Sequence, residues 1–285
     1  MRSAIVMEGG ALRTVFSTGV CDAFLEAGLM PDCFIGVSGG AAYGVSYLSR
    51  QNRRNLKMLC HYANDPRYMG LGNLLNPQNR AYFGLQFAYK DLPNRLVPFD
   101  YETFAQYPGA AEAVVTNLLT GKPEYMPIPR GQDREGVLRA SCAMPLLFPI
   151  IHIGGQPYLD GGCSDPIPYQ RAFDLGCDRV VVLLTRERSY RRKPESLQPL
   201  MDRYYRQYPN FLNTMHRRAE EYNLCRERLF QLEREGRAIV LAPESTAGFS
   251  RTEKDVAKIR ALWQAGYFQG RRMAEAVAMF WGQKG

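Results

Sequence analysis

The sequence predicts an α/β fold with three layers (α/β/α), in which helices cover both faces of a mainly parallel central sheet. Two observations indicate this fold. The first 50 residues contain two successive strand–loop–helix units, and two further apolar strands are predicted at 179–184 and 239–242. Successive units of this kind form parallel sheets with helices on both sides. The chain has 285 residues, 46% of them hydrophobic, and is therefore long enough to bury such a core.

The N-terminal elements follow from hydrophobic patterning. Residues 3–8 form an apolar run that ends at a pair of glycines, which predicts the first strand. Apolar residues at helical spacing predict a helix over 15–27. The continuous apolar run 33–37 predicts a buried strand, and a helix is predicted from 39 to about 49.

Residues 66–108 interrupt this alternation. They contain five of the 18 prolines and nine of the 33 aromatic residues, without a clean helical or strand period. One interpretation is a cap that forms an apolar groove. The other is a meandering connection whose aromatic side chains fill an edge of the core.

The middle of the chain predicts four elements before the β-branched strand 179–184. They are a strand at 113–116, a helix from about Asp133 to Ser141, and a hairpin of strands 150–153 and 157–159 that turns at Gly154-Gly155. The hairpin ends in Asp160-Gly161-Gly162.

The C-terminal third is predicted to be mostly helical. Residues 194–235 are heavily charged and helical in pattern, and the strand 239–242 follows them. Ser250 begins a capping box with Glu253, which predicts a helix carrying apolar residues 256, 259 and 263. A second helix is predicted from about 271 to 281.

Composition restricts the partners and the compartment. The net charge of +8 favours anionic partners such as nucleic acid, phospholipid head groups or acyl-CoA, but no nucleic-acid-binding motif accompanies it. The seven cysteines include no Cys-x-x-Cys pair, which argues against a disulfide framework or a zinc site and for a reducing compartment. The N-terminus has no signal-peptide core, and the longest apolar run, 143–151, is too short to span a bilayer. We therefore expect a cytoplasmic protein, at most peripheral to a membrane.

The stretch Gly36-Val37-Ser38-Gly39-Gly40 ends the second predicted strand and begins a helix. A sharp strand-to-helix turn of this kind exposes the serine hydroxyl beside the free N–H groups of the helix N-terminus. A serine so placed can attack an acyl group, and the helix N-terminus favours the developing negative charge. An ordinary βα loop is the alternative interpretation of the same pattern.

The turn after the first strand, Gly9-Gly10-Ala11-Leu12-Arg13, lacks the Gly-x-Gly-x-x-Gly pattern of a dinucleotide site. Its backbone N–H groups and the nearby Arg13 cation suit an oxyanion better.

A serine nucleophile also needs a base. None of the three histidines, His61, His152 and His216, lies at a glycine-flanked strand end, where a catalytic base is usually presented. Asp160 does, because it follows a strand and precedes two glycines. The alternative is a turn aspartate that accepts backbone N–H bonds.

Four segments, in this order, resemble the motifs of the patatin-like phospholipase family, in its bacterial branch. They are the loop 9–13, the elbow 36–40, the block from Ala140-Ser141-Cys142-Ala143-Met144-Pro145 through Phe148-Pro149, and Asp160-Gly161-Gly162. The resemblance covers about residues 3–185. It implies a catalytic core over 1–185 and a mostly helical extension over 186–285, packed on the same domain.

The resemblance also implies a function. A Ser38–Asp160 dyad would hydrolyse lipid acyl esters through a covalent acyl-enzyme, with an oxyanion hole at Gly9, Gly10 and Ala11. No metal or organic cofactor is implied. The expected partners are a lipid or acyl-ester substrate and, peripherally, an anionic membrane. Arg13, and Arg191 and Arg192 in the basic loop after strand 179–184, are the candidates for binding an anionic head group.

The loop departs from the family pattern at three positions. Glu8, Ala11 and Thr14 stand where the family usually has glycine. The Ala11 N–H stays available if the backbone there does not require a positive φ, and the charge of Glu8 is expected to oppose an oxyanion. Two alternatives therefore remain: an acyltransferase that uses the same dyad, or a catalytically weak lipid-binding protein.

Overall fold

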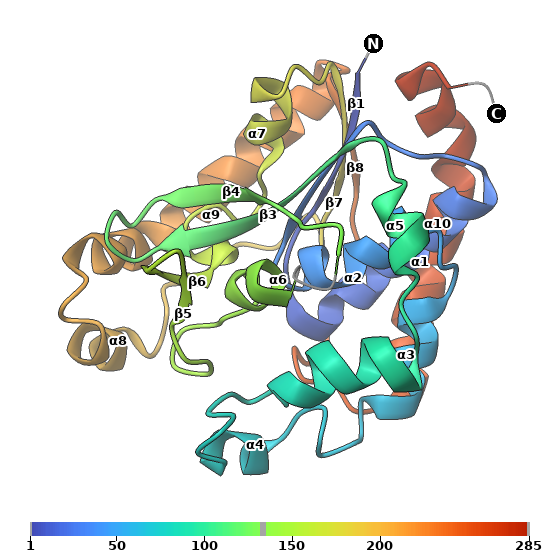
Figure 1. The fold of residues 1–285 in the computed structure, drawn as a ribbon. Helices are drawn as coiled ribbons and strands as arrows, with labels where there is room; N and C mark the ends of the chain where they lie inside the picture. The colour runs from blue at the N-terminus through green and yellow to red at the C-terminus, as the bar shows by residue number, and fades with distance from the viewer. Residues whose placement is uncertain (1, 132–134, 284–285) are drawn as a thin grey trace.

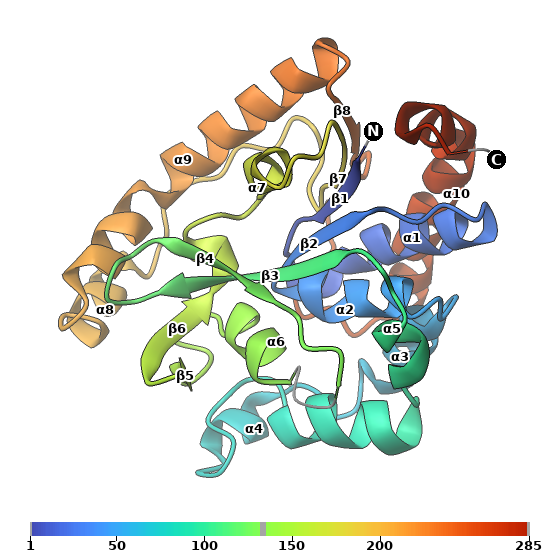
Figure 2. The same ribbon diagram turned by 45° about the horizontal axis from the view of Figure 1, so that its top comes forward.

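The computed structural model describes residues 2–131 and 135–283, and in it an eight-stranded sheet lies between two layers of helices (Figures 1 and 2). The strand order is β5-β6-β3-β2-β1-β7-β8, with β4 paired to β3. The ladders that join β3, β2, β1, β7 and β8 are parallel, whereas β4, β5 and β6 pair antiparallel. This arrangement confirms the predicted α/β fold. The strands are β1 (Ser3–Met7), β2 (Cys33–Val37), β3 (Ala110–Asn117), β4 (Pro123–Pro127), β5 (Ile151–Ile153), β6 (Gln156–Asp160), β7 (Arg179–Leu183) and β8 (Ala238–Leu241).

The core lies on both faces of this sheet, because alternate side chains of a strand point to opposite faces. In β1, Ile5 and Met7 join a cluster with the helices α1 and α10. Ala4 and Val6 face the other way, into a cluster with α7 and α9. Such continuous apolar strands are typical of parallel sheets that are buried on both sides. The helices are α1 (Val15–Glu26), α2 (Gly39–Leu48), α3 (Arg54–Tyr62), α4 (Leu71–Leu75), a π-helix (Phe87–Leu96), α5 (Tyr101–Ala105), α6 (Glu135–Ser141), α7 (Tyr169–Asp174), α8 (Gln198–Tyr204), α9 (Pro209–Arg234) and α10 (Val256–Trp281), with 3-10 turns at Ala11–Thr14 and Gly161–Cys163.

The C-terminal end corrects the prediction of two helices after Ser250. A single helix, α10, runs from Val256 to Trp281, and its N-cap is Asp255, whose carboxylate accepts the N–H groups of Ala257 and Lys258. Ser250 and Glu253 are bonded to one another in the turn before it rather than at the helix start.

Close packing explains why glycines within α10 do not end it. A Cβ on Gly266 would lie 2.0 Å from the carbonyl oxygen of Phe16, and one on Gly270 would lie 3.0 Å from Val20 Cα. The glycines thus let α10 approach α1, and the two helices lie side by side in both views (Figures 1 and 2).

Strand β3 has partners along both of its edges. Val114 pairs with both Val37 on β2 and Tyr125 on β4, so β2 and β4 lie on opposite edges. Thr116 pairs with both Pro123 on β4 and Leu159 on β6. Strands β2 and β6 therefore share one edge of β3 and end next to one another. The sequence did not predict β4, which is partly exposed and begins and ends with proline.

The predicted hairpin is confirmed as β5 and β6, and both glycines of its turn have positive φ. The predicted start of α6 near Asp133 lies outside the described residues. In the part of the chain that is described, no helix combines the length and the hydropathy needed to cross a membrane.

Candidate active site

Ser38 occupies the turn between β2 and α2, where its backbone has φ 53° and ψ −125°. A non-glycine residue at positive φ is strained by about 1–3 kcal/mol and persists only when its surroundings hold it there. The residues around this turn leave room only for glycine at positions 36 and 40. A Cβ on Gly36 would lie 2.5 Å from Ala41 Cα, and one on Gly40 would lie 2.3 Å from the carbonyl oxygen of Met7. The Ser38 N–H donates to Ser141 Oγ at 2.9 Å, which fixes the turn from α6.

Asp160, the last residue of β6, is brought to the same place by the shared edge of β3. It pairs with Val115, next to the pair of Val114 and Val37, and it is 5% exposed. Its Oδ1 accepts the N–H of Gly162 at 2.8 Å. A Cβ on Gly162 would lie 3.1 Å from that oxygen, so the two glycines after Asp160 let the chain turn closely around the carboxylate.

The electrostatics of Asp160 suit a base. Burial raises the pKa of the carboxyl above its ordinary value, and this effect outweighs the opposing hydrogen-bonding interactions of Ser38 and the Gly162 N–H. The positive charges of Arg218 and Arg192 also lower the pKa of Asp160, by less. A carboxylate with a raised pKa takes a proton from a hydroxyl more readily than an exposed one does.

The candidate oxyanion loop, residues 8–14, lies directly against Ser38. A Cβ on Gly9 would lie 2.8 Å from Ser38 Cβ, and one on Gly39 would lie 3.4 Å from the Ala11 nitrogen. Within the described residues, the N–H groups of Gly9, Gly10 and Ala11 donate to no other protein group. Free N–H groups beside a nucleophile, next to the N-terminus of α2, can stabilise an oxyanion.

Two expectations about this loop change. Ala11 does have a positive φ, 49°, so it replaces glycine there with strain, but its N–H still donates to no group among the described residues. Glu8 does not direct its charge at Ser38. Its carboxylate accepts the Thr185 N–H at 2.6 Å, the Thr185 hydroxyl at 3.1 Å and the Tyr222 hydroxyl at 2.6 Å.

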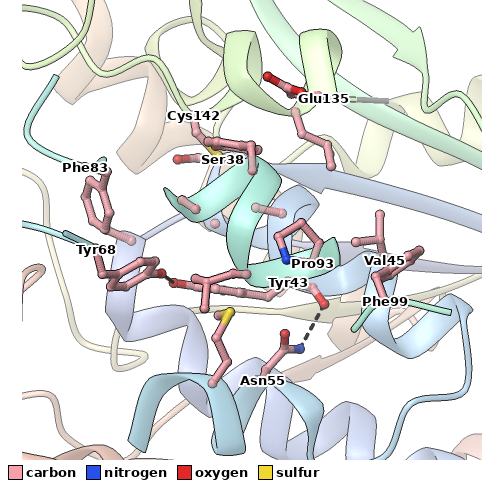
Figure 3. Close-up of a pocket in the computed structure, with 18 of the residues that line it drawn as sticks. Ser38, Tyr43, Val45, Asn55, Tyr68, Phe83, Pro93, Phe99, Glu135 and Cys142 are labelled. Carbon is pink, nitrogen blue, oxygen red and sulfur yellow. Dashed lines mark hydrogen bonds between the residues drawn. The ribbon is translucent and has the colours of Figure 1, made fainter. Parts of the chain in front are cut away.

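A cavity of about 120 Å³ opens from Ser38 between α2, α3 and the segment 83–101. Ser38 and Cys142 lie at one end and Asn55 at the other, with aromatic side chains between them (Figure 3). Cavities of roughly this size hold benzene-sized apolar groups. Residues of the unusual segment 66–108 form much of the wall, including Tyr68, Phe83, Tyr89, Leu92, Pro93, Phe99 and Tyr101. The segment therefore forms part of an apolar cavity, as the cap interpretation predicts. Several of these rings also belong to the core.

The predicted head-group candidates differ in their partners. The Arg13 guanidinium makes no hydrogen bond or ion pair with the described residues, and burial together with the charges of Arg186 and Arg251 lowers the pKa of Arg13 to about 10. Arg191 instead pairs with Glu227, and Arg192 with Glu195. None of the three candidate arginines lines the cavity. Arg13 is thus a cation of the loop without a hydrogen-bond or ion-pair partner among the described residues, and Arg186 and Arg251 are close enough to lower its pKa.

Among the described residues, no histidine lines the cavity at Ser38. His152 is on the exposed side of β5, His61 contacts the carbonyl oxygen of Lys57, and His216 pairs with Asp202 at the surface. Among the described residues, no group of three His, Cys, Asp or Glu side chains is placed to hold a metal ion.

Sequence reasoning did not single out three residues of this site. Ser141 accepts the Ser38 N–H, and Cys142 interacts with the Ser38 hydroxyl. Arg218 donates to the carbonyl oxygen of Gly162 at 2.8 Å. Ser141 and Cys142 stand in the motif block 140–145, so the sequence contained a signal that could have pointed to them. Arg218 is one of many charged residues on a helix, and nothing in the sequence distinguishes it.

Known proteins resemble this chain in sequence, and one solved structure aligns with it. A family model described as patatin-like phospholipase matches residues 5–173, and one described as a domain of unknown function (DUF6363) matches residues 208–282. The uncharacterized protein YjjU of Escherichia coli (strain K12) is 29% identical over 195 residues, which are 65% of this chain and 52% of YjjU. The chain thus spans about half the length of this relative. The crystal structure of VipD from Legionella pneumophila aligns with a TM-score of 0.43 and 12% identity, over 96% of this chain and 67% of VipD.

Proposed function

Because the chain belongs to the patatin-like phospholipase family, we propose that it is a lipid acyl hydrolase in which Ser38 is the nucleophile and Asp160 the base. The observation that carries this proposal is the meeting of three features at one point. A strained serine, a buried carboxylate with a raised pKa and a loop of free N–H groups converge there. None of the three histidines lines the cavity beside Ser38 in the described structure, whereas Asp160 ends a strand next to the Ser38 turn.

The reaction proceeds in two steps. Asp160 takes the proton of the Ser38 hydroxyl as the oxygen bonds to the ester carbonyl carbon, and the N–H groups of Gly9, Gly10 and Ala11 hold the resulting oxyanion. The bond to the leaving alcohol then breaks, and the alcohol takes the proton from Asp160. In the second step water attacks the acyl-enzyme, gives its proton to Asp160, and releases the acid as Ser38 regains a proton.

The substrate is a lipid or other acyl ester whose acyl chain enters the cavity beside Ser38. The apolar lining accounts for this orientation, since buried methylenes contribute about 0.8 kcal/mol each. Arg13 is part of the oxyanion loop, and its positive charge would favour an anionic leaving group. The exposed Arg191 and Lys193 would favour a peripheral contact with an anionic membrane in the cytoplasm.

The test is Ser38→Ala, compared with Ser17→Ala as a control. The Ser17 hydroxyl is buried without a hydrogen-bond partner in the described chain, so its loss leaves the site intact. A panel of phospholipids, lysophospholipids, p-nitrophenyl esters and acyl-CoAs should be hydrolysed by the wild type and by Ser17→Ala. We expect Ser38→Ala to lose turnover and labelling by a fluorophosphonate probe while melting normally. Hydrolysis by Ser38→Ala at the wild-type rate would refute the proposal, and adding an alcohol acceptor separates acyl transfer from hydrolysis.

A further inference from the structure

The helix α9 reaches the oxyanion loop through a line of buried polar side chains. Arg226, at 0% exposure, donates from Nη1 to the Tyr222 hydroxyl at 3.4 Å. Tyr222 donates in turn to Glu8 Oε1 at 2.6 Å. Glu8 immediately precedes Gly9 and Gly10, so this line ends at the first residue of the loop.

Thr185 binds the other oxygen of the Glu8 carboxylate. Its N–H and its hydroxyl contact Glu8 Oε2 at 2.6 and 3.1 Å, and the hydroxyl also lies 2.8 Å from the carbonyl oxygen of Gly9. A Cβ on Gly10 would lie 2.7 Å from the Thr185 hydroxyl oxygen. The position of Thr185 therefore sets the position of the peptide groups that face Ser38.

Arg226 also fixes the segment that carries Thr185. Its Nη2 donates to the carbonyl oxygens of Glu187 at 2.7 Å and Arg188 at 3.2 Å. Further along the chain, the carbonyl oxygen of Arg251 accepts the N–H of Leu12 at 3.1 Å. The residues that hold the loop at these two points, Arg226 and Arg251, both lie within 208–282, the segment that matches the domain of unknown function.

Stability alone is a poor explanation of this arrangement. Burying a carboxylate and a guanidinium is costly, and apolar residues of similar volume often stabilise a fold equally well. The hydrogen bonds among Arg226, Tyr222 and Glu8 instead supply directional contacts. Each bond has a preferred length and angle, and together they hold the loop in one position relative to Ser38.

We propose that segment 208–282 contributes positioning residues to the active site. These residues are Tyr222 and Arg226, which hold the oxyanion loop in place through Glu8 and Thr185. This inference rests on the proposed function, because it assigns the N–H groups of the loop to the oxyanion. It gives the C-terminal segment a role in turnover without contact with the substrate.

Tyr222→Phe tests the inference with the smallest change. The ring keeps its contacts with Tyr190 and Arg226, and only the hydroxyl that holds Glu8 is lost. With a soluble neutral ester we expect kcat to fall about 10- to 100-fold, as for misplacements of about 1 Å, while KM stays within twofold. The control is Tyr169→Phe, which removes a hydroxyl bonded to the carbonyl oxygen of Cys225 on the same helix but not to the loop. It should keep the wild-type kcat.

A double variant tells positioning from a general loss of stability. If Tyr222 acts through Glu8, then Glu8→Gln combined with Tyr222→Phe loses no more kcat than the greater of the two single losses. Hydrogen exchange gives a readout without turnover: peptides covering residues 9–14 should exchange faster in Tyr222→Phe and unchanged in Tyr169→Phe. If Tyr222→Phe does not fold, Arg226→Lys replaces it and should show the same loss of kcat.

The outcomes separate this inference from the function it rests on. A wild-type kcat and unchanged exchange in a folded Tyr222→Phe protein, with Ser38→Ala inactive, would overturn the positioning role and leave the proposed function in place. Full activity in Ser38→Ala would overturn the proposed function itself. Faster exchange at 9–14 would then still show that α9 holds the loop.

Discussion

The carboxylate of Asp160 reaches Ser38 because β6 continues the line of β2 along one edge of β3. Val37, the last residue of β2, pairs with Val114, and Asp160 pairs with the next residue, Val115. The two strands point toward one another, so their final residues meet. Antiparallel β6 thereby contributes a side chain at the edge of the sheet where parallel strands place their ligand-binding loops.

Asp160→Asn should lower kcat by roughly two to four orders of magnitude, because the amide keeps the shape of the carboxylate but accepts no proton. The measurement is kcat for a soluble ester, with melting followed in parallel. His152→Ala serves as the control, since His152 lies exposed on the neighbouring strand, and it should keep its activity. If His152 were essential and Asp160 dispensable, a serine–histidine mechanism would replace the proposed one.

Gly9→Ala should reduce kcat by about 10²–10³, the usual effect of losing one oxyanion donor. The new Cβ would lie 2.8 Å from Ser38 Cβ and 2.9 Å from the carbonyl oxygen of Val37, so the loop must move away from the serine. Gly72→Ala on α4 is the matched control, because no atom lies within 4 Å of its Cβ position. Equal kcat in a folded Gly9→Ala variant and the wild type would place the oxyanion hole elsewhere.

The pH profile should report the environment of Asp160. The base must be ionised, so kcat/KM falls as the pH drops through its pKa, which burial raises above the ordinary value of about 3.9. Arg218 lowers this pKa, and Arg218→Gln should therefore move the acidic limb to higher pH. Arg217→Gln removes the neighbouring exposed arginine, which pairs with Glu221, and should leave the limb in place. Identical limbs in both variants would show that Asp160 does not control the profile.

Arg13→Gln should weaken the binding of anionic substrates more than that of neutral ones. A hydrogen bond to a charged group contributes about 1.5–3 kcal/mol, so KM for lysophosphatidylglycerol should rise roughly tenfold or more relative to KM for a neutral p-nitrophenyl ester. Arg217→Gln removes an exposed arginine that is paired with Glu221 and should leave this ratio unchanged. A constant ratio in Arg13→Gln would exclude a head-group role for this residue.

The sequence predicted the parallel part of the sheet well, because its strands are continuous apolar runs bounded by glycines. The strands β2 and β7 lie within one residue of their predicted ends. The edge was harder to predict. Strand β4 escaped notice because a partly exposed, proline-bounded strand has neither an apolar run nor a clear alternation. The two helices predicted at the C-terminal end are one, α10, in which Gly266 and Gly270 allow close packing on α1.

Only part of the candidate site could be predicted from the sequence. Ser38 and Asp160 stand in short motifs, and local chemistry was sufficient to propose them. The surroundings of Glu8 depend on Thr185 and Tyr222, which only the completed fold brings near. The charge of Glu8 therefore gave a misleading signal as long as its hydrogen-bond partners were unknown.

The packing of α10 on α1 also sets an order of events during synthesis. Gly266 and Gly270 pack against Phe16 and Val20 of α1, which precede them by about 250 residues in the chain. Contacts between residues so far apart form slowly, because a long loop must close before they are made. The apolar face of α1 therefore stays uncovered until α10 has been synthesised and has docked on it.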